Sequence, residues 1–202
     1  MLKDKIKVAV FVSGGGTNLQ AILESERRGE IPDGEIKLVL SNNPSAYALE
    51  RAKNFGVKSV CVDKSVYKTL KEREEKTIEI LEENGIELIV LAGYLSILSA
   101  DFTKKYENRI INVHPSLIPS FCGKGYYGLK VHEEALKYGV KVTGATVHFV
   151  NEIPDGGEII MQKAVEILEG DTPEVLQRRV MERAEWILLP SALQKVCKKL
   201  RS

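Results

Sequence analysis

The sequence predicts an α/β protein with a Rossmann-like, open, mostly parallel twisted sheet, helices on both faces and an antiparallel C-terminal excursion. Three observations lead to this prediction. Apolar strand-like runs alternate with helical segments from residue 6 onward, as in parallel sheets with helical crossovers. The first run ends in a glycine-rich turn that leads into a helix. After residue 140 the alternation stops, and two strand-like runs follow one another directly.

The elements are predicted in order from their apolar patterns. Residues 6–12 form a near-continuous apolar run, which is typical of a strand buried on both faces. Leu19, Ile22 and Leu23 then follow at helical spacing. The remaining elements of the alternating part are a strand at 36–40, a helix at 47–54, a strand at 57–62, a helix at 71–84, and strands at 86–92 and 110–114.

The C-terminal part differs in pattern. Strands at 142–150 and 158–165 flank a turn, which predicts an antiparallel hairpin added to the sheet. Thr172 is a candidate N-cap and Pro173 suits the first helical position, so a long helix should begin there. We expect it to run to about Leu189, where Pro190 kinks or breaks it.

Composition excludes several classes of protein. The 202 residues are 44% hydrophobic and 28% charged with a net charge of +1, which is ordinary for a soluble domain and lacks the basic excess of a nucleic-acid binder. No apolar run approaches the length of a membrane span, and no signal peptide precedes the first strand. The three cysteines indicate neither a disulfide framework nor a metal knuckle. We therefore expect a cytoplasmic protein without nucleic-acid or membrane partners.

The glycine-rich segment Ser-Gly-Gly-Gly-Thr-Asn at 13–18 is a candidate phosphate site. Glycines let the backbone approach an anion, and the following helix N-terminus supplies N–H donors and a favourable dipole. No Gly-Lys-Ser/Thr follows, so this is not a Walker loop. The second strand ends in Ser-Asn-Asn at 41–43 without the acidic residue of dinucleotide sites, which favours a small monophosphate. The alternative is a tight turn with glycines for packing.

Asn112 and His114 are candidate catalytic residues. They lie two positions apart on a predicted strand, so they face the same side, at the carboxyl end where open sheets bind ligands. A histidine can donate a proton near neutral pH and an amide can stabilise an oxyanion, which suits attack on a carbonyl. Considered alone, His114 is equally consistent with a structural histidine, and Asp155, in Asp-Gly-Gly, with an ordinary turn.

The other two histidines have less defined roles. His148 lies in a predicted strand, either as a partner that supports a functional residue or simply as a buried residue, and His132 is expected at the start of a surface helix. No histidine and acidic spacing matches a metal motif, so no metal is predicted.

Four motifs in this order resemble one known family. They are Ser-Gly-Gly-Gly-Thr-Asn-Leu-Gln (13–20), Leu-Ala-Gly-Tyr-Leu-Ser-Ile-Leu-Ser (91–99), Asn-Val-His-Pro-Ser-Leu-Ile-Pro (112–119) and Val-His-Phe-Val-Asn-Glu-Ile-Pro-Asp-Gly-Gly (147–157). Together they resemble the phosphoribosylglycinamide formyltransferases, a branch of the folate-dependent formyltransferase superfamily, from about residue 6 to residue 190. The resemblance implies transfer of a formyl group from 10-formyltetrahydrofolate to the amine of glycinamide ribonucleotide in purine synthesis.

The resemblance also implies roles for individual residues. Asn112, His114 and Asp155 would be catalytic, with His148 behind them. The substrate phosphate and ribose would be held by Gly15, Gly16, Thr17, Asn18 and Glu185. The folate would be held by Tyr94, Leu95, Ser96, Ile97, Leu98, Val150 and Asp155. We expect a single domain over 1–202, in which residues 1–100 form the phosphate- and nucleotide-binding half and residues 101–202 the catalytic and folate-binding half, as a monomer or homodimer.

The sequence departs from the family pattern in three places. Ser96 stands where members often carry an arginine beside the folate, and Leu70 where another arginine is usual near the phosphate, with Lys68 or Lys71 as substitutes. The segment 121–130 is rich in glycine and tyrosine and is either a mobile flap or a surface loop.

Three alternatives follow from the same residues. A methionyl-tRNA formyltransferase usually has a further C-terminal domain, and a formyltetrahydrofolate deformylase usually has a further N-terminal one; the length and neutral charge of this chain favour neither. A nucleotide-binding module without catalysis would need only the glycine loop, and the presence of Asn112, His114 and Asp155 argues against it.

Overall fold

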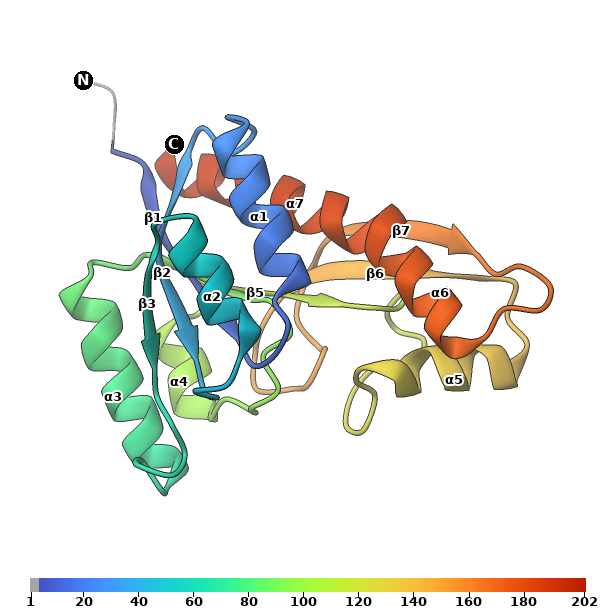
Figure 1. Ribbon diagram of the computed structural model, residues 1–202, viewed down its shortest axis with the longest axis horizontal. Helices are drawn as coiled ribbons and strands as arrows, with labels where there is room; N and C mark the ends of the chain where they lie inside the picture. The colour runs from blue at the N-terminus through green and yellow to red at the C-terminus, as the bar shows by residue number, and fades with distance from the viewer. Residues whose placement is uncertain (1–3) are drawn as a thin grey trace.

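Helices cover both faces of a seven-stranded sheet in the computed structural model, which describes residues 4–202 (Figure 1). The strands are β1 (Ile6–Val12), β2 (Gly34–Ser41), β3 (Lys58–Cys61), β4 (Leu88–Leu91), β5 (Ile110–His114), β6 (Val142–Phe149) and β7 (Ile159–Glu166). Their order is β3-β2-β1-β4-β5-β6-β7. The first five are parallel and the last two pair antiparallel, so the predicted fold class is confirmed.

The helices follow the predicted alternation over most of the chain. They are α1 (Thr17–Arg27), α2 (Tyr47–Asn54), α3 (Leu70–Glu83), α4 (Ala100–Lys105), α5 (Leu129–Tyr138), α6 (Pro173–Val180), a π-helical turn η1 (Met181–Glu185) and α7 (Trp186–Arg201). Within residues 4–202, no helix is both long enough and apolar enough to cross a bilayer.

Strand β1 joins the two hydrophobic cores because its alternate side chains enter opposite faces of the sheet. Val8 and Val10 belong to the core that includes side chains of α1, α6 and α7. Ala9 and Phe11 belong to the core that includes side chains of α3 and α4. All four are fully buried, which explains why the sequence of this strand is apolar without alternation.

The strand order reverses direction beside β1, and this creates a crevice at the carboxyl ends of the parallel strands. This end of the sheet is called its binding edge below. From β1 the chain adds β2 and β3 on one side, then returns to add β4 and β5 on the other. Consequently the loop after β1 and the loop after β4 leave the same edge in different directions. Open α/β sheets bind ligands in the crevice at this point.

Two expectations about the C-terminal half are wrong. Pro190 does not break the helix near Leu189, because α7 continues through it to Arg201. Pro190 and Leu193 are buried, and such burial offsets the helix cost of a proline, which is about 3 kcal/mol. His132 is not on the surface: it lies within α5 on the face that is buried, and its side chain is fully enclosed.

Candidate active site

The glycine-rich loop after β1 is held in a conformation that only glycine accepts easily. Gly16 lies immediately before α1 with φ of 72°, in the left-handed region. A Cβ on Gly16 would lie 2.6 Å from the Cβ of Ala48 in α2, which is closer than real Cβ contacts. The third glycine of the segment is therefore required both for the turn and for the close approach of α2. The loop places the N-terminus of α1 at the binding edge of the sheet.

Asn18 and Glu185 meet at this edge from opposite ends of the chain. The Asn18 side-chain amide donates to the Glu185 carboxylate over 2.6 Å, and both residues are buried. Burial raises the pKa of Glu185, and the Asn18 hydrogen bond opposes that shift only in part. Glu185 is the last residue of the π-helical turn η1, a kind of turn often found at functional sites.

His114 lies at the end of β5 between two acceptors. Its Nε2 is 2.8 Å from the carbonyl oxygen of Phe121, and its Nδ1 is 3.5 Å from a carboxylate oxygen of Asp155. Burial lowers the pKa of His114, while the Asp155 charge and the Phe121 carbonyl oppose the shift. Both ring nitrogens therefore face hydrogen-bond acceptors, which favour the imidazolium but do not outweigh the effect of burial.

Asn112 and His148 face each other across the β5–β6 pair, where they are register partners. The Nδ2 of Asn112 lies 3.2 Å from Nε2 of His148. His148 Nδ1 donates to the carbonyl oxygen of Phe149 over 2.7 Å, which fixes the orientation of the ring. The same Nε2 is 3.5 Å from the carboxylate of Asp155. His148 thus lies between Asn112 and Asp155 and contacts both.

The turn that carries Asp155 has a fixed shape. Asp155 has φ of 55°, which short polar residues tolerate, and a Cβ on Gly157 would lie 1.8 Å from the carbonyl oxygen of Phe149. Burial alone would raise the pKa of Asp155, but the His148 contact, the His114 charge and the Gly123 N–H together leave it lowered. The Gly123 N–H donates to the carboxylate over 2.8 Å.

The loop after β4 is attached to the ends of β1 and β2. The Leu95 N–H donates to the Ser13 hydroxyl over 2.9 Å, and the Asn42 amide donates to the Ser96 hydroxyl over 2.6 Å. Leu95 and Ile97 are 69% and 73% exposed, so this loop presents apolar side chains to solvent beside polar anchors. Such exposed apolar residues at a binding edge are suited to contact with a flat apolar ring.

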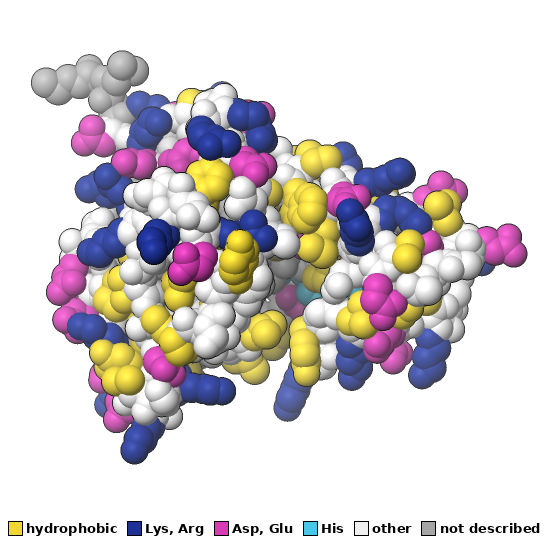
Figure 2. Space-filling model, in the orientation of Figure 1, with side chains coloured by type: hydrophobic (Ala, Val, Ile, Leu, Met, Phe, Trp, Pro, Cys, Tyr) yellow, Lys and Arg dark blue, Asp and Glu magenta, His cyan; other side chains and the backbone are white. Residues whose placement is uncertain are grey.

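Tyr94, Leu98 and Val150 lie beneath this surface, because all three pack against the same core. The Tyr94 ring lies 5.3 Å from the Phe11 ring, and Val150 donates its N–H to the Ile110 carbonyl. Figure 2 shows a hollow between the side of the molecule that carries α2 and the side that carries α5 and α6, with a histidine and an acidic side chain at its floor.

Three features were not recognised from the sequence. The segment 121–123 covers His114 and Asp155 with backbone groups, so it is more than a surface loop. Arg51 of α2 donates to the Gly15 carbonyl over 2.8 Å, whereas within residues 4–202 no hydrogen bond or ion pair joins Lys68 or Lys71 to the glycine loop. The sequence did contain a signal for this contact. Arg51 lies one turn after Tyr47, and α2 begins at the carboxyl end of β2, beside the end of β1 that carries the glycine loop. Neither side-chain nitrogen of the third histidine, His132, has a partner within residues 4–202.

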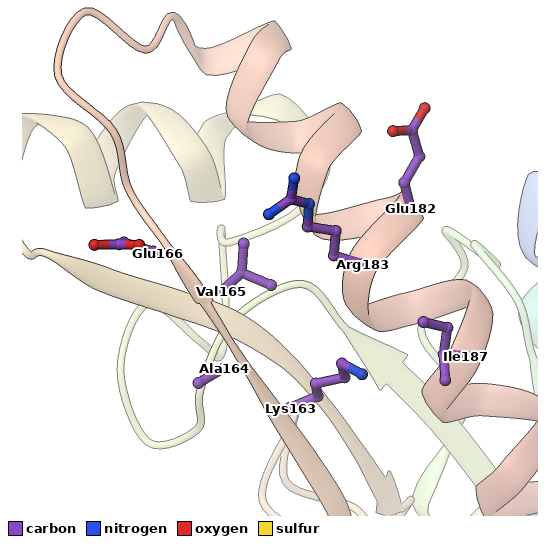
Figure 3. A pocket seen from close by; sticks show the side chains of 7 residues that line it. All are labelled: Lys163, Ala164, Val165, Glu166, Glu182, Arg183 and Ile187. Carbon is purple, nitrogen blue, oxygen red and sulfur yellow. The ribbon is translucent and has the colours of Figure 1, made fainter.

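A pocket of about 380 Å³ lies apart from these residues, between β7 and the stretch that leads from η1 into α7 (Figure 3). Arg183 extends toward β7 and Glu182 points away from it. Its lining has two basic and two acidic side chains and includes none of the predicted site residues; the lining residues are Lys163, Ala164, Val165, Glu166, Glu182, Arg183 and Ile187. Nor do residues 4–202 contain a group of three His, Cys, Asp or Glu side chains placed to hold a metal ion.

Comparison with known sequences points to one family. Residues 6–193 match the formyl transferase family. A phosphoribosylglycinamide formyltransferase of Haemophilus influenzae is 37% identical over 188 residues, which are 93% of this chain and 85% of that protein. A trifunctional purine biosynthetic protein adenosine-3 of Gallus gallus is 45% identical over 96% of this chain, and this chain spans only 18% of its length.

Solved structures agree in fold over nearly the whole chain. A glycinamide ribonucleotide transformylase of Symbiobacterium toebii has a TM-score of 0.90 and 40% identity, covering 96% of this chain and 89% of that one. A phosphoribosylglycinamide formyltransferase of Bacillus halodurans has a TM-score of 0.87 and 38% identity, covering 96% of each chain. The chain therefore belongs to the formyl transferase family and groups there with the phosphoribosylglycinamide formyltransferases.

Proposed function

We propose that this protein transfers the formyl group of 10-formyltetrahydrofolate to the amine of glycinamide ribonucleotide, giving formylglycinamide ribonucleotide and tetrahydrofolate in de novo purine biosynthesis. The observation that carries the proposal is the position of Asn112, His114 and Asp155 at the same sheet edge as the glycine-rich loop, where His114 contacts Asp155 and His148 links Asn112 to Asp155. The names and coverage of the relatives support the same activity.

The ribonucleotide would bind along the edge of β1. Gly15, Gly16, Thr17 and Asn18 offer backbone N–H groups at the N-terminus of α1, where the helix dipole favours a phosphate. The Glu185 carboxylate lies next to Asn18 and would accept hydrogen bonds from the ribose hydroxyls.

His114 and Asn112 would stabilise the charge that develops on the formyl oxygen. The amide N–H of Asn112 and an N–H of protonated His114 are the donors, and one such donor typically contributes about a hundred- to a thousandfold in rate. The negative charge of Asp155 favours the protonated form of His114. Asp155 would also position a water that carries the proton released by the attacking amine to the departing folate nitrogen, so that protons balance.

The segment 121–123 must move aside for this chemistry. The Phe121 carbonyl engages His114 Nε2, and the Gly123 N–H engages Asp155 Oδ2. A formyl oxygen that binds His114 through Nε2 therefore has to replace the Phe121 carbonyl.

The folate would lie over the loop after β4 and the turn before β7. Exposed Leu95 and Ile97 fit the apolar face of a pterin, and the backbone of Ser96 and the carbonyl group of Val150 lie beside it. When bound, the folate supplies the one-carbon unit, and the protein supplies orientation and electrostatics. Ser96 is already engaged by Asn42, so we propose that the folate tail makes no charged contact at this position.

We further propose a cytoplasmic enzyme that acts as one unit, as a monomer or homodimer, without nucleic-acid partners. The Asn18–Glu185 contact supports a single unit because it joins the phosphate- and nucleotide-binding half, 1–100, to the catalytic and folate-binding half, 101–202.

The deciding experiment is steady-state turnover of 10-formyltetrahydrofolate with and without glycinamide ribonucleotide, followed by folate absorbance. Turnover that requires the ribonucleotide and yields its formylated product is expected. Turnover without the ribonucleotide would indicate a hydrolase instead. No turnover under either condition would refute the proposed donor or acceptor.

A further inference from the structure

Two carbonyl groups of the glycine-rich loop are turned toward α2 by hydrogen bonds. The Gly14 carbonyl accepts from the Ala48 N–H over 3.1 Å. The Gly15 carbonyl accepts from Nε of Arg51 over 2.8 Å. Two donors of one helix thus fix two successive peptide groups of the loop.

The orientation of these carbonyls determines where the loop N–H groups point. In a trans peptide the C=O and the following N–H are antiparallel. The N–H groups of Gly15, which is exposed, and of Gly16, which is half-buried, are therefore directed away from α2. Neither N–H donates to an acceptor within residues 4–202. A pair of unsatisfied N–H groups beside a helix N-terminus is the arrangement that binds an anion.

Arg51 is itself fixed in place by further contacts. Its Nη1 donates to the Gln20 side chain over 3.1 Å, and its guanidinium lies 5.0 Å from the centre of the Tyr47 ring. Within residues 4–202, no carboxylate forms an ion pair with Arg51, although other arginines such as Arg28 do have such partners. Its positive charge therefore stays available to the adjoining peptide.

We propose that Arg51 is a positioning residue for the substrate phosphate, acting through the Gly15–Gly16 peptide rather than by direct contact. A charged donor on the Gly15 carbonyl holds the peptide in the orientation that presents the Gly16 N–H. It also polarises the peptide, which strengthens that N–H as a donor. The inference rests on the proposed function, because it assigns the anion at this loop to the phosphate of the ribonucleotide.

The test compares Arg51→Met with Lys53→Met, which removes a positive charge from an exposed position of the same helix. Arg51→Met should raise KM for glycinamide ribonucleotide about 10- to 100-fold, the value of a charge-assisted hydrogen bond, with kcat within about twofold. It should leave kcat/KM for the unphosphorylated glycinamide riboside unchanged. Lys53→Met should change neither value, and Arg51→Lys should lie between wild type and Arg51→Met.

Two outcomes would overturn the inference. One is an unchanged KM for the ribonucleotide in Arg51→Met. The other is an equal loss with the ribonucleotide and the riboside, in Arg51→Met or in Arg51→Lys, because a general disturbance of the fold would affect both.

A second measurement separates this inference from the proposed function. Inorganic phosphate binding, measured by calorimetry on the wild-type protein and the same variants, needs no turnover. If the wild type lacks formyl transfer but binds phosphate, and Arg51→Met does not, the proposed function fails and Arg51 keeps its role. If phosphate binds equally to both proteins, the role of Arg51 fails whatever the activity.

Discussion

The side-chain amide of Asn18 donates a 2.6 Å hydrogen bond to the carboxylate of Glu185, across a separation of 167 positions in the sequence. The contact joins the first turn of α1 to the last residue of the π-helical turn η1. It encloses a carboxylate whose pKa is raised by burial. A charge held in this way costs stability, and its retention indicates a function for the carboxylate.

Glu185→Gln should therefore stabilise the fold above neutral pH and weaken substrate binding. Since the pKa of Glu185 is raised on folding, the folded state binds more protons than the unfolded state above pH 4.5. The free energy of unfolding should consequently fall as pH rises from there, and Glu185→Gln should remove this decline. Urea unfolding at pH 5 and pH 8 measures the effect, with Glu182→Gln on the same turn as control. KM for the ribonucleotide should rise about tenfold. Equal pH slopes in wild type and variant would contradict this account.

His114→Ala should lower kcat by about two to four orders of magnitude, because it removes the charged hydrogen-bond donor to the formyl oxygen. Asn112→Ala should lower kcat by about two to three orders, the usual cost of one oxyanion donor. The two losses should not add in the double variant, since both donors act on the same oxygen. The measurement is single-turnover transfer, with circular dichroism to verify the fold. Near-full activity of His114→Ala would remove this residue from the mechanism.

Elements that follow from local sequence patterns were predicted, whereas features that depend on packing between distant segments were not. Strand β1 was predictable because its apolar run follows from burial on both faces, and α2 was predicted with the bounds that the structure has. The C-terminal helix was not, since Pro190 is accommodated by tertiary burial that local propensity does not include. The burial of His132 likewise depends on how α5 packs.

The candidate site shows the same limit. Asn112, His114 and Asp155 were predicted as a set, and the structure brings them together with His148. Their catalytic roles remain proposals. The contact of Arg51 with the glycine loop was missed although its place in α2 offered a signal, because the contact itself depends on how α2 packs against the loop, a relationship between segments 36 residues apart.

Asp155→Asn should move the alkaline limb of the pH–rate profile to lower pH. The negative charge of Asp155 raises the pKa of His114 against the lowering caused by burial. Without this charge the imidazolium of His114 loses its proton at lower pH. The kcat/KM for 10-formyltetrahydrofolate therefore begins to decline at a lower pH. The profile is measured between pH 5 and pH 9 with the ribonucleotide saturating. An unshifted limb would mean that another group sets the protonation state.

His132→Leu should flatten the acid-side dependence of stability. Burial lowers the pKa of His132 to about 4, and the charge of His114 adds to the effect. Between pH 6.5 and pH 4 the unfolded state therefore binds more protons, and stability falls as pH falls through this range. The difference is about 3 kcal/mol over the full range. Urea unfolding at pH 7 and pH 4.5 compares wild type and variant. A variant that loses as much stability as wild type would show that other groups cause the decline.

Gly16→Ala and Gly14→Ala form a matched pair within the glycine loop. Gly16 has a φ of 72° and its added Cβ would meet Ala48 at 2.6 Å, whereas an added Cβ on Gly14 meets nothing within 4 Å. The left-handed conformation alone costs an L-residue about 1–2 kcal/mol, so Gly16→Ala should lower the free energy of unfolding by at least that amount. Gly14→Ala should stay within about 0.5 kcal/mol of wild type.

The variants Gly16→Ala and Gly14→Ala also distinguish whether phosphate binding depends on the left-handed conformation at Gly16 or only on the number of glycines in the loop. Displacing α2 from Gly16 also displaces Arg51, which binds the Gly15 carbonyl. Gly16→Ala should therefore raise KM for the ribonucleotide and weaken binding of inorganic phosphate, while Gly14→Ala retains both. If Gly14→Ala lost phosphate binding equally, the flexibility of the segment would matter rather than the single left-handed position, and the fixed loop geometry inferred from the Arg51 contact would be wrong.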